Sequence, residues 1–130
     1  MEQILIPMSP GELLDKITIL EIKSERMSDE VKLRNVRLEL SLLNDTWKTS
    51  VAVDGTVSRI HADLKSINEA LWEIEDDIRD KEKAREFDQK FIDLARAVYV
   101  TNDKRANAKK ELNTYLGSDI VEEKSYQDYS

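Results

Sequence analysis

The chain has no cysteine among its 130 residues. Its composition therefore excludes a disulfide framework, a thiol nucleophile and a zinc–thiolate site. Glycine and proline are also scarce, with three and two residues, while 36% of the residues are charged. This composition suits long helices better than sheets. The lack of cysteine also fits a reducing compartment, and we expect a cytoplasmic protein.

Long apolar runs and excess basic charge are absent as well. No stretch approaches the roughly 18 apolar residues of a membrane span. The segment MEQILIPMSP has neither the basic start nor the apolar core of a signal peptide. The formal net charge is -7 and the isoelectric point is about 4.8, which does not suit nucleic acid or an anionic membrane. We therefore expect neither as a partner.

The sequence does contain clear helical periodicity. Ser9-Pro10-Gly11-Glu12 is typical of a helix start, with Ser9 as the cap, and the first predicted helix runs to about Met27. A second helix begins around Ser28-Asp29-Glu30. Its apolar residues recur at alternating spacings of three and four, at Leu33, Val36, Leu40, Leu43 and Trp47.

The second half of the chain repeats this pattern twice. After a loop at 49–56, apolar residues at the same spacing continue from Val57 to Ile78 and form one face of a helix, which we call its seam. Lys81 and Arg85 then fall on the same seam. We expect a bend near 84–88 and a last helix whose seam runs from Phe91 to Tyr115. Gly117 is a natural helix stop.

Short connections force neighbouring helices to be antiparallel. The sequence therefore predicts one all-α domain, an up-down bundle of about four helices with long coiled-coil-like hairpins. Residues 1–8 are expected to form a short extended arm, 9–116 the helices and 117–130 a C-terminal tail. In the expected register, one layer across the bundle contains Leu13, Leu43, Leu64 and Ala108. The adjacent layer contains Ile17, Leu40, Ile67 and Arg105.

The first predicted helix is apolar on two faces. Leu13, Ile17 and Leu20 face the predicted core, whereas Ile19 and Ile22 point the other way. We predict that a second subunit of a homodimer, or the docked tail, covers these two isoleucines. The alternative is an ordinary surface, since folded surfaces are largely apolar.

Few residues indicate catalysis or a cofactor, and we assign none. His61, the only histidine, lies off the seam and is expected to face solvent. Glu73, Asp77 and Asp80 share one flank of the third helix, where three carboxylates are able to hold magnesium. All-α nucleotide pyrophosphohydrolases use such acids, but only the E-x-x-D half of their pattern is present, so a solvated charged face is the favoured interpretation.

The segment LLDKITILEIKSER also resembles, in its apolar spacing, the first helix of the helical chorismate mutases. Those enzymes need several cationic side chains that converge on a dicarboxylate. The candidates here are Lys16, Arg26, Arg79 and Arg105. The arginine expected near the start of the first helix is absent, because Leu13 and Leu14 stand there.

Arg105 lies on the seam of the last predicted helix, close to Asn102 and Lys109. A buried guanidinium needs a carboxylate partner, and the register suggests Glu21. One interpretation is a polar layer that fixes helix register. The other is an anion-binding cleft formed by Asn102, Arg105 and Lys109. The aromatic residues are expected in the core or in a groove, at Trp47, Trp72 and Tyr99.

Four stretches, SPGELLDKITILEIKSER, LWEIEDDIRDKE, FIDLARAVYVTNDKRANAKKELN and GSDIVEEKSY, resemble an uncharacterised family of short proteins from bacteria and their phages. The resemblance covers almost the whole chain and implies no activity and no catalytic residues. The sequence favours a non-enzymatic binding or assembly protein that works through helix–helix contacts. The alternative is a small all-α enzyme, pyrophosphohydrolase-like or chorismate-mutase-like, that acts on an anionic metabolite or nucleotide.

Overall fold

The computed structural model describes residues 1–129, and within them all regular structure is helical. This confirms the predicted all-α bundle. Each helix begins after a Ser or Asp side chain that accepts a hydrogen bond from the backbone N–H three residues later, at Ser9, Asp29, Asp54 and Asp88. The four helices are α1 (Pro10–Arg26), α2 (Glu30–Ser50), α3 (Gly55–Ala84) and α4 (Gln89–Leu116).

The turn between α3 and α4 shows why apolar packing stops there. Arg85 ends α3 in the left-handed conformation, with φ of 58°. Lys81, on the apolar seam of α3, reaches across the turn, and its Nζ lies 2.9 Å from both Glu86 and Asp88. The predicted bend at 84–88 is therefore present, and the ammonium group of Lys81 bridges its two sides.

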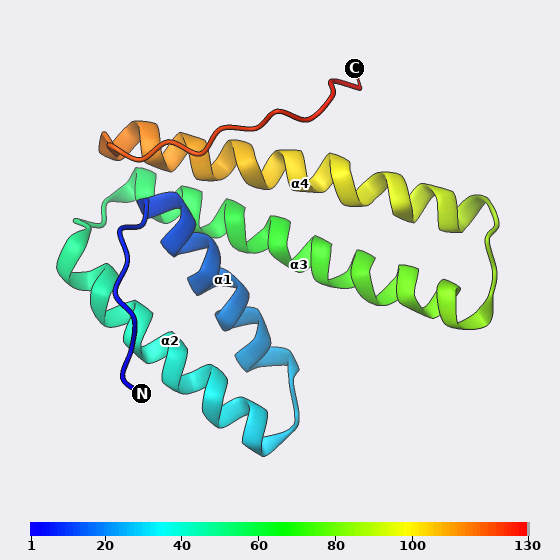
Figure 1. Ribbon diagram of the computed structural model, residues 1–130, viewed down its shortest axis with the longest axis horizontal. Coiled ribbons are helices and arrows are strands. Elements are labelled where there is room, and N and C mark those ends of the chain that lie inside the picture. Colours follow the sequence, from blue (N-terminus) through cyan, green and yellow to red (C-terminus); the bar gives the residue numbers. More distant parts are fainter. Residues whose placement is uncertain (130) are drawn as a thin grey trace.

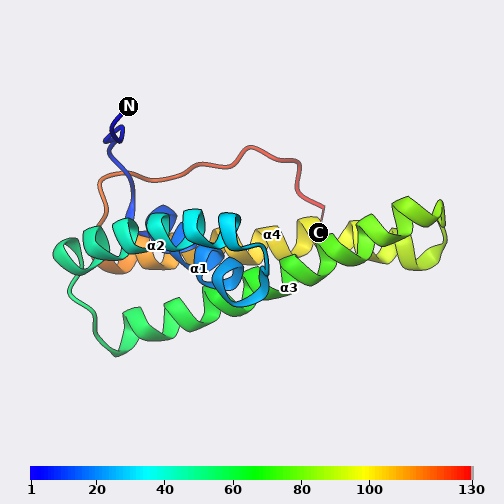
Figure 2. The same cartoon turned by 90° about the horizontal axis from the view of Figure 1, so that it is seen from below.

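The four helices form two hairpins, and α1 lies between α2 and the long α3–α4 hairpin (Figures 1 and 2). Within residues 1–129, α1 comes within 8 Å, Cα to Cα, of all three other helices, whereas α2 comes that close only to α1. Both sides of α1 are therefore covered by its own chain. Ile22 is only 2% exposed, so its burial does not require the predicted second subunit, whereas Ile19 remains partly exposed.

The main hydrophobic core lies at one end of the α3–α4 hairpin, which we call the base. It combines the first half of α1, the last half of α2, the start of α3 and the end of α4, through Leu14, Trp47, Ile60 and Leu112. Leu13, Leu64 and Ala108 share this cluster with Leu43 packed against it, as the register predicted. The other end of the hairpin, residues 74–98, extends beyond α1 and α2 (Figure 1). We call it the distal hairpin.

Two segments without regular structure flank the helices. The arm at 1–8 carries the exposed apolar residues Ile4, Leu5 and Ile6. The tail turns at Gly117, with φ of 67°, and runs back beside α4 (Figures 1 and 2). No helix within residues 1–129 combines the length and apolar character needed to cross a membrane.

Candidate functional site

The interface between α1 and α4 is polar, and it begins with a close approach at Gly11. The Gly11 N–H donates to Asn113 Oδ1 at 2.7 Å. A Cβ atom at Gly11 would lie 2.5 Å from the carbonyl oxygen of Lys109, well inside normal contact distance. Glycine is therefore what allows the two helix backbones to meet here.

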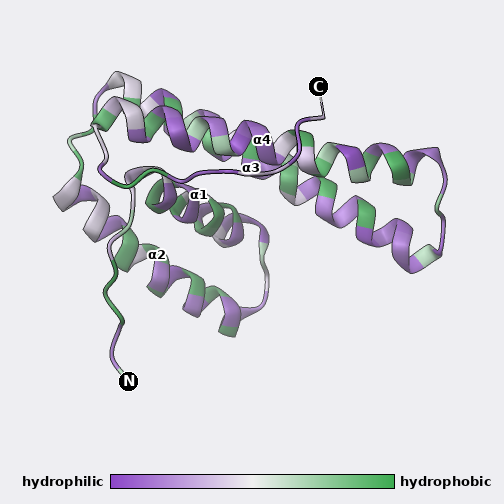
Figure 3. Ribbon diagram, turned by 45° about the horizontal axis from the view of Figure 1, so that its top comes forward, coloured by the Kyte–Doolittle hydropathy of each residue, from purple (hydrophilic) through white to green (hydrophobic). Residues whose placement is uncertain are grey.

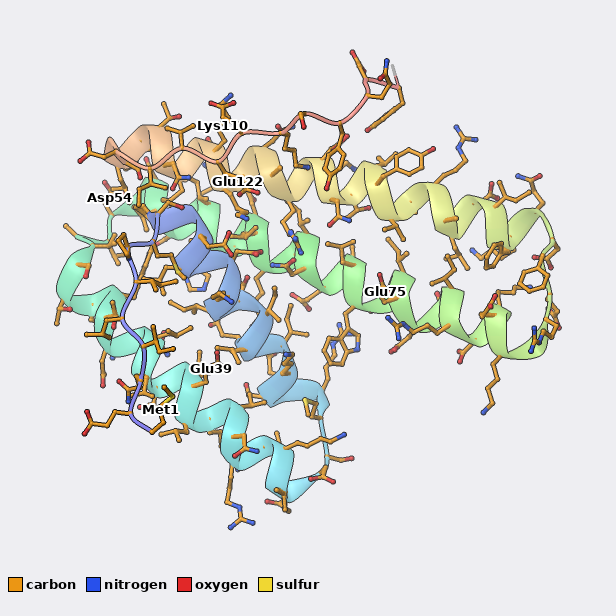
Figure 4. All side chains as sticks on the ribbon, in the orientation of Figure 1. Met1, Glu39, Asp54, Glu75, Lys110 and Glu122 are labelled. Carbon is orange, nitrogen blue, oxygen red and sulfur yellow. The ribbon has the colours of Figure 1, made fainter. Side chains whose placement is uncertain are left out.

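Lys109 joins α1, α4 and the tail. Its Nζ lies 2.6 Å from Glu12 and 2.9 Å from Glu122, and its side chain is only 8% exposed. Burial opposes the charge on Lys109, but its hydrogen bonds to Glu12 and Glu122 outweigh burial and raise its pKa. Hydrogen bonding to Lys109 in turn lowers the pKa of Glu122. Figure 4 places Glu122 on the part of the tail that passes α4. With both carboxylates bound to it, Lys109 is not available to an anionic ligand.

Asp15 is the buried acid of this interface, at 4% exposure. The Asn68 amide donates to Asp15 Oδ1 and to Thr18 Oγ1, both at 2.9 Å. Arg105 Nε lies 3.8 Å from Asp15 Oδ1. The predicted Arg105–Glu21 pair is therefore wrong, because Arg105 faces Asp15 and Glu21 pairs with His61 of α3.

Glu21 and its neighbours bind α3 instead. His61 Nε2 lies 2.8 Å from Glu21 Oε1, and His61 is half-buried. The prediction that His61 faces solvent is therefore wrong. One turn further along α1, Glu25 lies 2.5 Å from Lys65 Nζ, and that hydrogen bond raises the Lys65 pKa. These pairs fix how α1 crosses α3.

Two cavities flank the polar interface, and both are lined by Asn102 and Arg105. The first, about 650 Å³, lies between α4 and the tail, and we call it the tail cavity. The second, about 580 Å³, lies between α1 and the α3–α4 hairpin, and we call it the notch. The apolar side chains of the notch are Ile19, Ile22, Leu71 and Trp72, and its other charged side chains are Glu75, Asp76 and Arg79.

The acidic run of α3 does not gather into a metal site. Glu73 Oε1 turns to the Arg26 guanidinium at 3.4 Å, away from Asp77 and Asp80. Nowhere in residues 1–129 do three His, Asp or Glu side chains come together in a way that would hold a metal. Of the three acids, Glu73 pairs with Arg26 of the neighbouring helix α1.

The cations proposed to bind a dicarboxylate do not converge as a group. Arg79 and Arg105 both line the notch, but Arg79 Nε lies 3.2 Å from Glu75. Arg26 lies near Glu69 and Glu73, and its guanidinium stands 6.0 Å from the Trp72 ring centre. Lys16 is exposed to solvent.

The sequence contains one signal for the buried acid. Gly11, Asp15, Thr18 and Ile22 follow one another at spacings of four, three and four, which is one face of a helix. All four are buried in the structure. A small residue, an acid and a hydroxyl on a buried stripe indicate a polar helix–helix contact.

Comparison with known proteins identifies a family whose function is unknown. Residues 4–129 match a family model described as a family of unknown function, DUF6165. This range includes most of the arm and all of the tail that the structure describes. No curated protein and no solved structure matches the chain.

Proposed function

We propose that this chain, which belongs to the family of unknown function DUF6165, is a non-enzymatic assembly protein that binds an amphipathic helix of a partner protein in the notch. The observation that carries the proposal is the make-up of the notch, an apolar floor beside charged side chains of which Asp76 alone forms no ion pair within residues 1–129. Grooves of this kind receive the apolar face of a helix in many complexes. The absence of cysteine suits a cytoplasmic setting.

The floor of the notch is shaped for apolar side chains. Ile22 and Leu71 are buried beneath it, while Ile19 and Trp72 are partly exposed. A large aromatic residue in a partly enclosed site is the type of residue that dominates binding energy at interfaces. Ile19 and Trp72 are therefore the expected anchor contacts.

The carboxylates that form no ion pair define the charge of the expected partner, because Glu75 is already paired with Arg79 and Arg105 faces Asp15. Asp76 lines the notch, and Figure 4 marks Glu75 on the same helix, α3. Asp76, Asp77 and Asp80 form no ion pair with the residues described, 1–129, and the whole chain carries a net charge of -7. Complementary charges steer and select partners. The partner helix should therefore carry Lys or Arg beside its apolar face.

The distal hairpin extends this surface. Figure 3 shows hydrophobic segments on both of its helices, where no third helix of residues 1–129 lies. Ile74 and Ile78 are only half-buried, and Ile92 is exposed. A long partner helix would bury them along with the floor of the notch. Contiguous exposed apolar surface of this kind often marks an interaction site.

A second copy of the chain is one occupant to test, in line with the homodimer expected from the sequence. The outer face of α2 presents Val31, Leu38 and Leu42, which are 60%, 63% and 38% exposed. Arg34 and Arg37 lie on the same helix. If this face fills the notch, light scattering should give about twice the 15.1 kDa chain mass, and Ile19→Asp should yield a folded monomer.

The proposal can be tested with a synthetic amphipathic helix that has Leu at helical spacing and Lys elsewhere. We expect it to bind the folded chain, to change the emission of Trp72 and to shift the amide resonances of Ile19 and Asp76. Trp47 is buried in the core and should not respond. A peptide with the same Leu pattern and Glu in place of Lys should bind at least about tenfold more weakly, since like charges repel.

Two matched variants locate the site. Ile19→Asp should weaken binding of the Leu/Lys peptide by about tenfold or more, as expected for an anchor residue. Leu38→Asp makes the same kind of change on the outer face of α2 and should leave binding unchanged. Capture from host extract with these three chains then identifies the natural partner as a protein retained by the wild type and Leu38→Asp but lost by Ile19→Asp. Equal binding by both variants, or resonance shifts confined to another face, would overturn the proposal.

A further inference from the structure

We propose that the tail cavity is a second binding site, for a small ligand that carries one phosphate or carboxylate group on a ring. This site lies between α4 and the tail, on the other side of Asn102 and Arg105 from the notch, and it shares only these two residues with the notch. Its volume of about 650 Å³ falls within the range of roughly 300–1,000 Å³ that small-molecule sites occupy. The site is defined by those of its polar groups that are not already bound within the chain.

The charged side chains of the tail cavity pair with one another except for one. Asp103 lies 3.4 Å from Lys124, and hydrogen bonding to Asp103 also raises the pKa of Tyr129. Glu122 lies 2.9 Å from Lys109. Arg105 is the remaining charged side chain that lines the cavity. The cavity lining therefore has one more cation than anions.

Arg105 keeps most of its hydrogen-bonding capacity. Its Nε faces Asp15 at 3.8 Å, which is too long for a hydrogen bond. The guanidinium makes no hydrogen bond with any residue from 1 to 129, and neither does the side chain of Asn102, one turn earlier on α4. Arginine presents a planar fork that matches phosphate and carboxylate oxygens. Arg105 and Asn102 together form the anion-binding end of the site.

Three tyrosines form the other end. Tyr99 of α4 and Tyr129 of the tail meet edge to face, with ring centres 5.1 Å apart. Tyr126 also lines the cavity, and Lys124 Nζ lies 5.5 Å from its ring centre. Tyrosine rings pack against apolar or ring-shaped groups while their hydroxyls remain able to hydrogen-bond. A ligand with a ring beside its anionic group uses both ends.

The notch is the less suitable place for an anion, although Arg105 lines it too. Asp76 lines the notch and forms no ion pair with residues 1–129, so it would repel an anion there. In the tail cavity, by contrast, both carboxylates are bound to lysines. The charge distribution thus directs a cationic helix to one side of Arg105 and an anion to the other.

Phenyl phosphate and benzoate are suitable probes, with benzyl alcohol as the neutral control. Titrated against the full isotope-labelled chain, each anion should shift the amides of Asn102, Arg105 and Tyr126. Benzyl alcohol should bind at least about tenfold more weakly, because it lacks a charge-assisted hydrogen bond with Arg105. Binding of only one of the two anions would support the site and identify the anionic group that it takes.

Variants on α4 test the assigned roles. Arg105→Gln should raise the dissociation constant of the bound anion by about tenfold or more, and Arg105→Lys should raise it less. Arg96→Gln, at an exposed arginine of the same helix, should leave it unchanged. Asn102→Ala, at a side chain without a hydrogen bond, provides a second measurement if Arg105→Gln fails to fold, and it should also weaken binding.

Three results would overturn the proposal. They are equal binding of benzoate and benzyl alcohol, unchanged affinity in both Arg105→Gln and Asn102→Ala, and no binding of either anion at about 10 mM, the weak end of ligand affinity. Ile19→Asp should leave the affinity for the anion unchanged. Different experiments therefore test the tail site and the helix-binding notch.

Discussion

The two ends of the α3–α4 hairpin differ in what covers them. At the base, α1 packs against both helices, and Ile60 and Leu112 are fully buried. In the distal hairpin the same two helices have only each other within residues 1–129, and there Leu94 alone is buried while Ile74, Ile78 and Val98 remain half-exposed. The period of apolar residues is similar along the whole hairpin. A continuous apolar seam therefore specifies that α3 and α4 pair. The side chains of that pair form a hydrophobic core only where α1 also covers them.

The largest effect is expected when the same residue type is truncated at the two ends of α3. Ile60→Ala, at a fully buried position, should lower the free energy of unfolding by about 3–4 kcal/mol through lost burial and a cavity. Ile78→Ala, at a half-buried position, should lower it by about 1 kcal/mol or less. Urea unfolding followed by circular dichroism measures both. Equal losses would remove the contrast between the base and the distal hairpin.

The next effect concerns the polar contact that joins α1 to both helices of the hairpin. Asp15→Ala should cost about 2–3 kcal/mol, because it removes one of the two acceptors of the buried Asn68 amide and the acid that faces Arg105. In a double-mutant cycle, Asp15→Ala and Arg105→Met should be coupled by about 0.5–1 kcal/mol. Glu21→Gln and Arg105→Met should be additive, since Glu21 pairs with His61. Coupling in the second cycle would contradict the observed register.

A smaller effect is expected from the two helical glycines. Gly11→Ala should destabilise the chain by about 1–3 kcal/mol, because its methyl group meets the Lys109 carbonyl at 2.5 Å. Gly55→Ala is the matched control at the start of α3, where a Cβ atom has open space. It should be neutral or stabilising by up to about 1 kcal/mol. The melting temperature should therefore fall in Gly11→Ala and stay unchanged or rise in Gly55→Ala.

The smallest effect is the release of the tail at low pH. The Glu122 pKa is lowered by Lys109, so the ion pair stabilises the docked tail fully above the usual Glu pKa of about 4.3. That contribution is lost as the pH falls through the lower pKa of the docked state. Because Glu122 is half-exposed, the effect should stay below about 1 kcal/mol.

Amide resonances of the tail followed against pH measure this release. The shifts should move toward those of a free tail as the solution is acidified below the usual Glu range. Glu122→Gln should remove this step and leave the base of the hairpin unchanged. A tail whose resonances are insensitive to pH in the wild type would show that Lys109 and Glu122 do not hold it.

Local features of the helices were predictable because they depend on nearby residues. The cap at Ser9, the start at Asp29, the bend at 84–88 and the stop at Gly117 all agree with the structure. The layer that contains Leu13, Leu43, Leu64 and Ala108 also agrees. The helix period fixes which side chains share a face, and short turns limit which helices face one another.

The partners of the polar side chains were not predictable in the same way. Arg105 was placed on the correct face, but a shift of less than two turns along α1 exchanges Glu21 for Asp15 as the nearest acid. The sequence predicts that Ile22 needs burial, and its own chain supplies it because α1 lies between α2 and the α3–α4 hairpin. The sequence pattern shows that a face is apolar, whereas the crossing of the helices determines what covers it.

Hydrogen exchange measured residue by residue tests the difference between the two ends most directly. The amides of α1 and of the base of the hairpin, in 57–67 and 108–116, should exchange only through global unfolding. Those of the distal hairpin should exchange faster, through local opening of a two-helix segment. Addition of the Leu/Lys peptide should slow exchange around Trp72 and in the distal hairpin. Uniform protection from 57 to 116 without the peptide, or faster exchange in α1 than in the distal hairpin, would contradict the account.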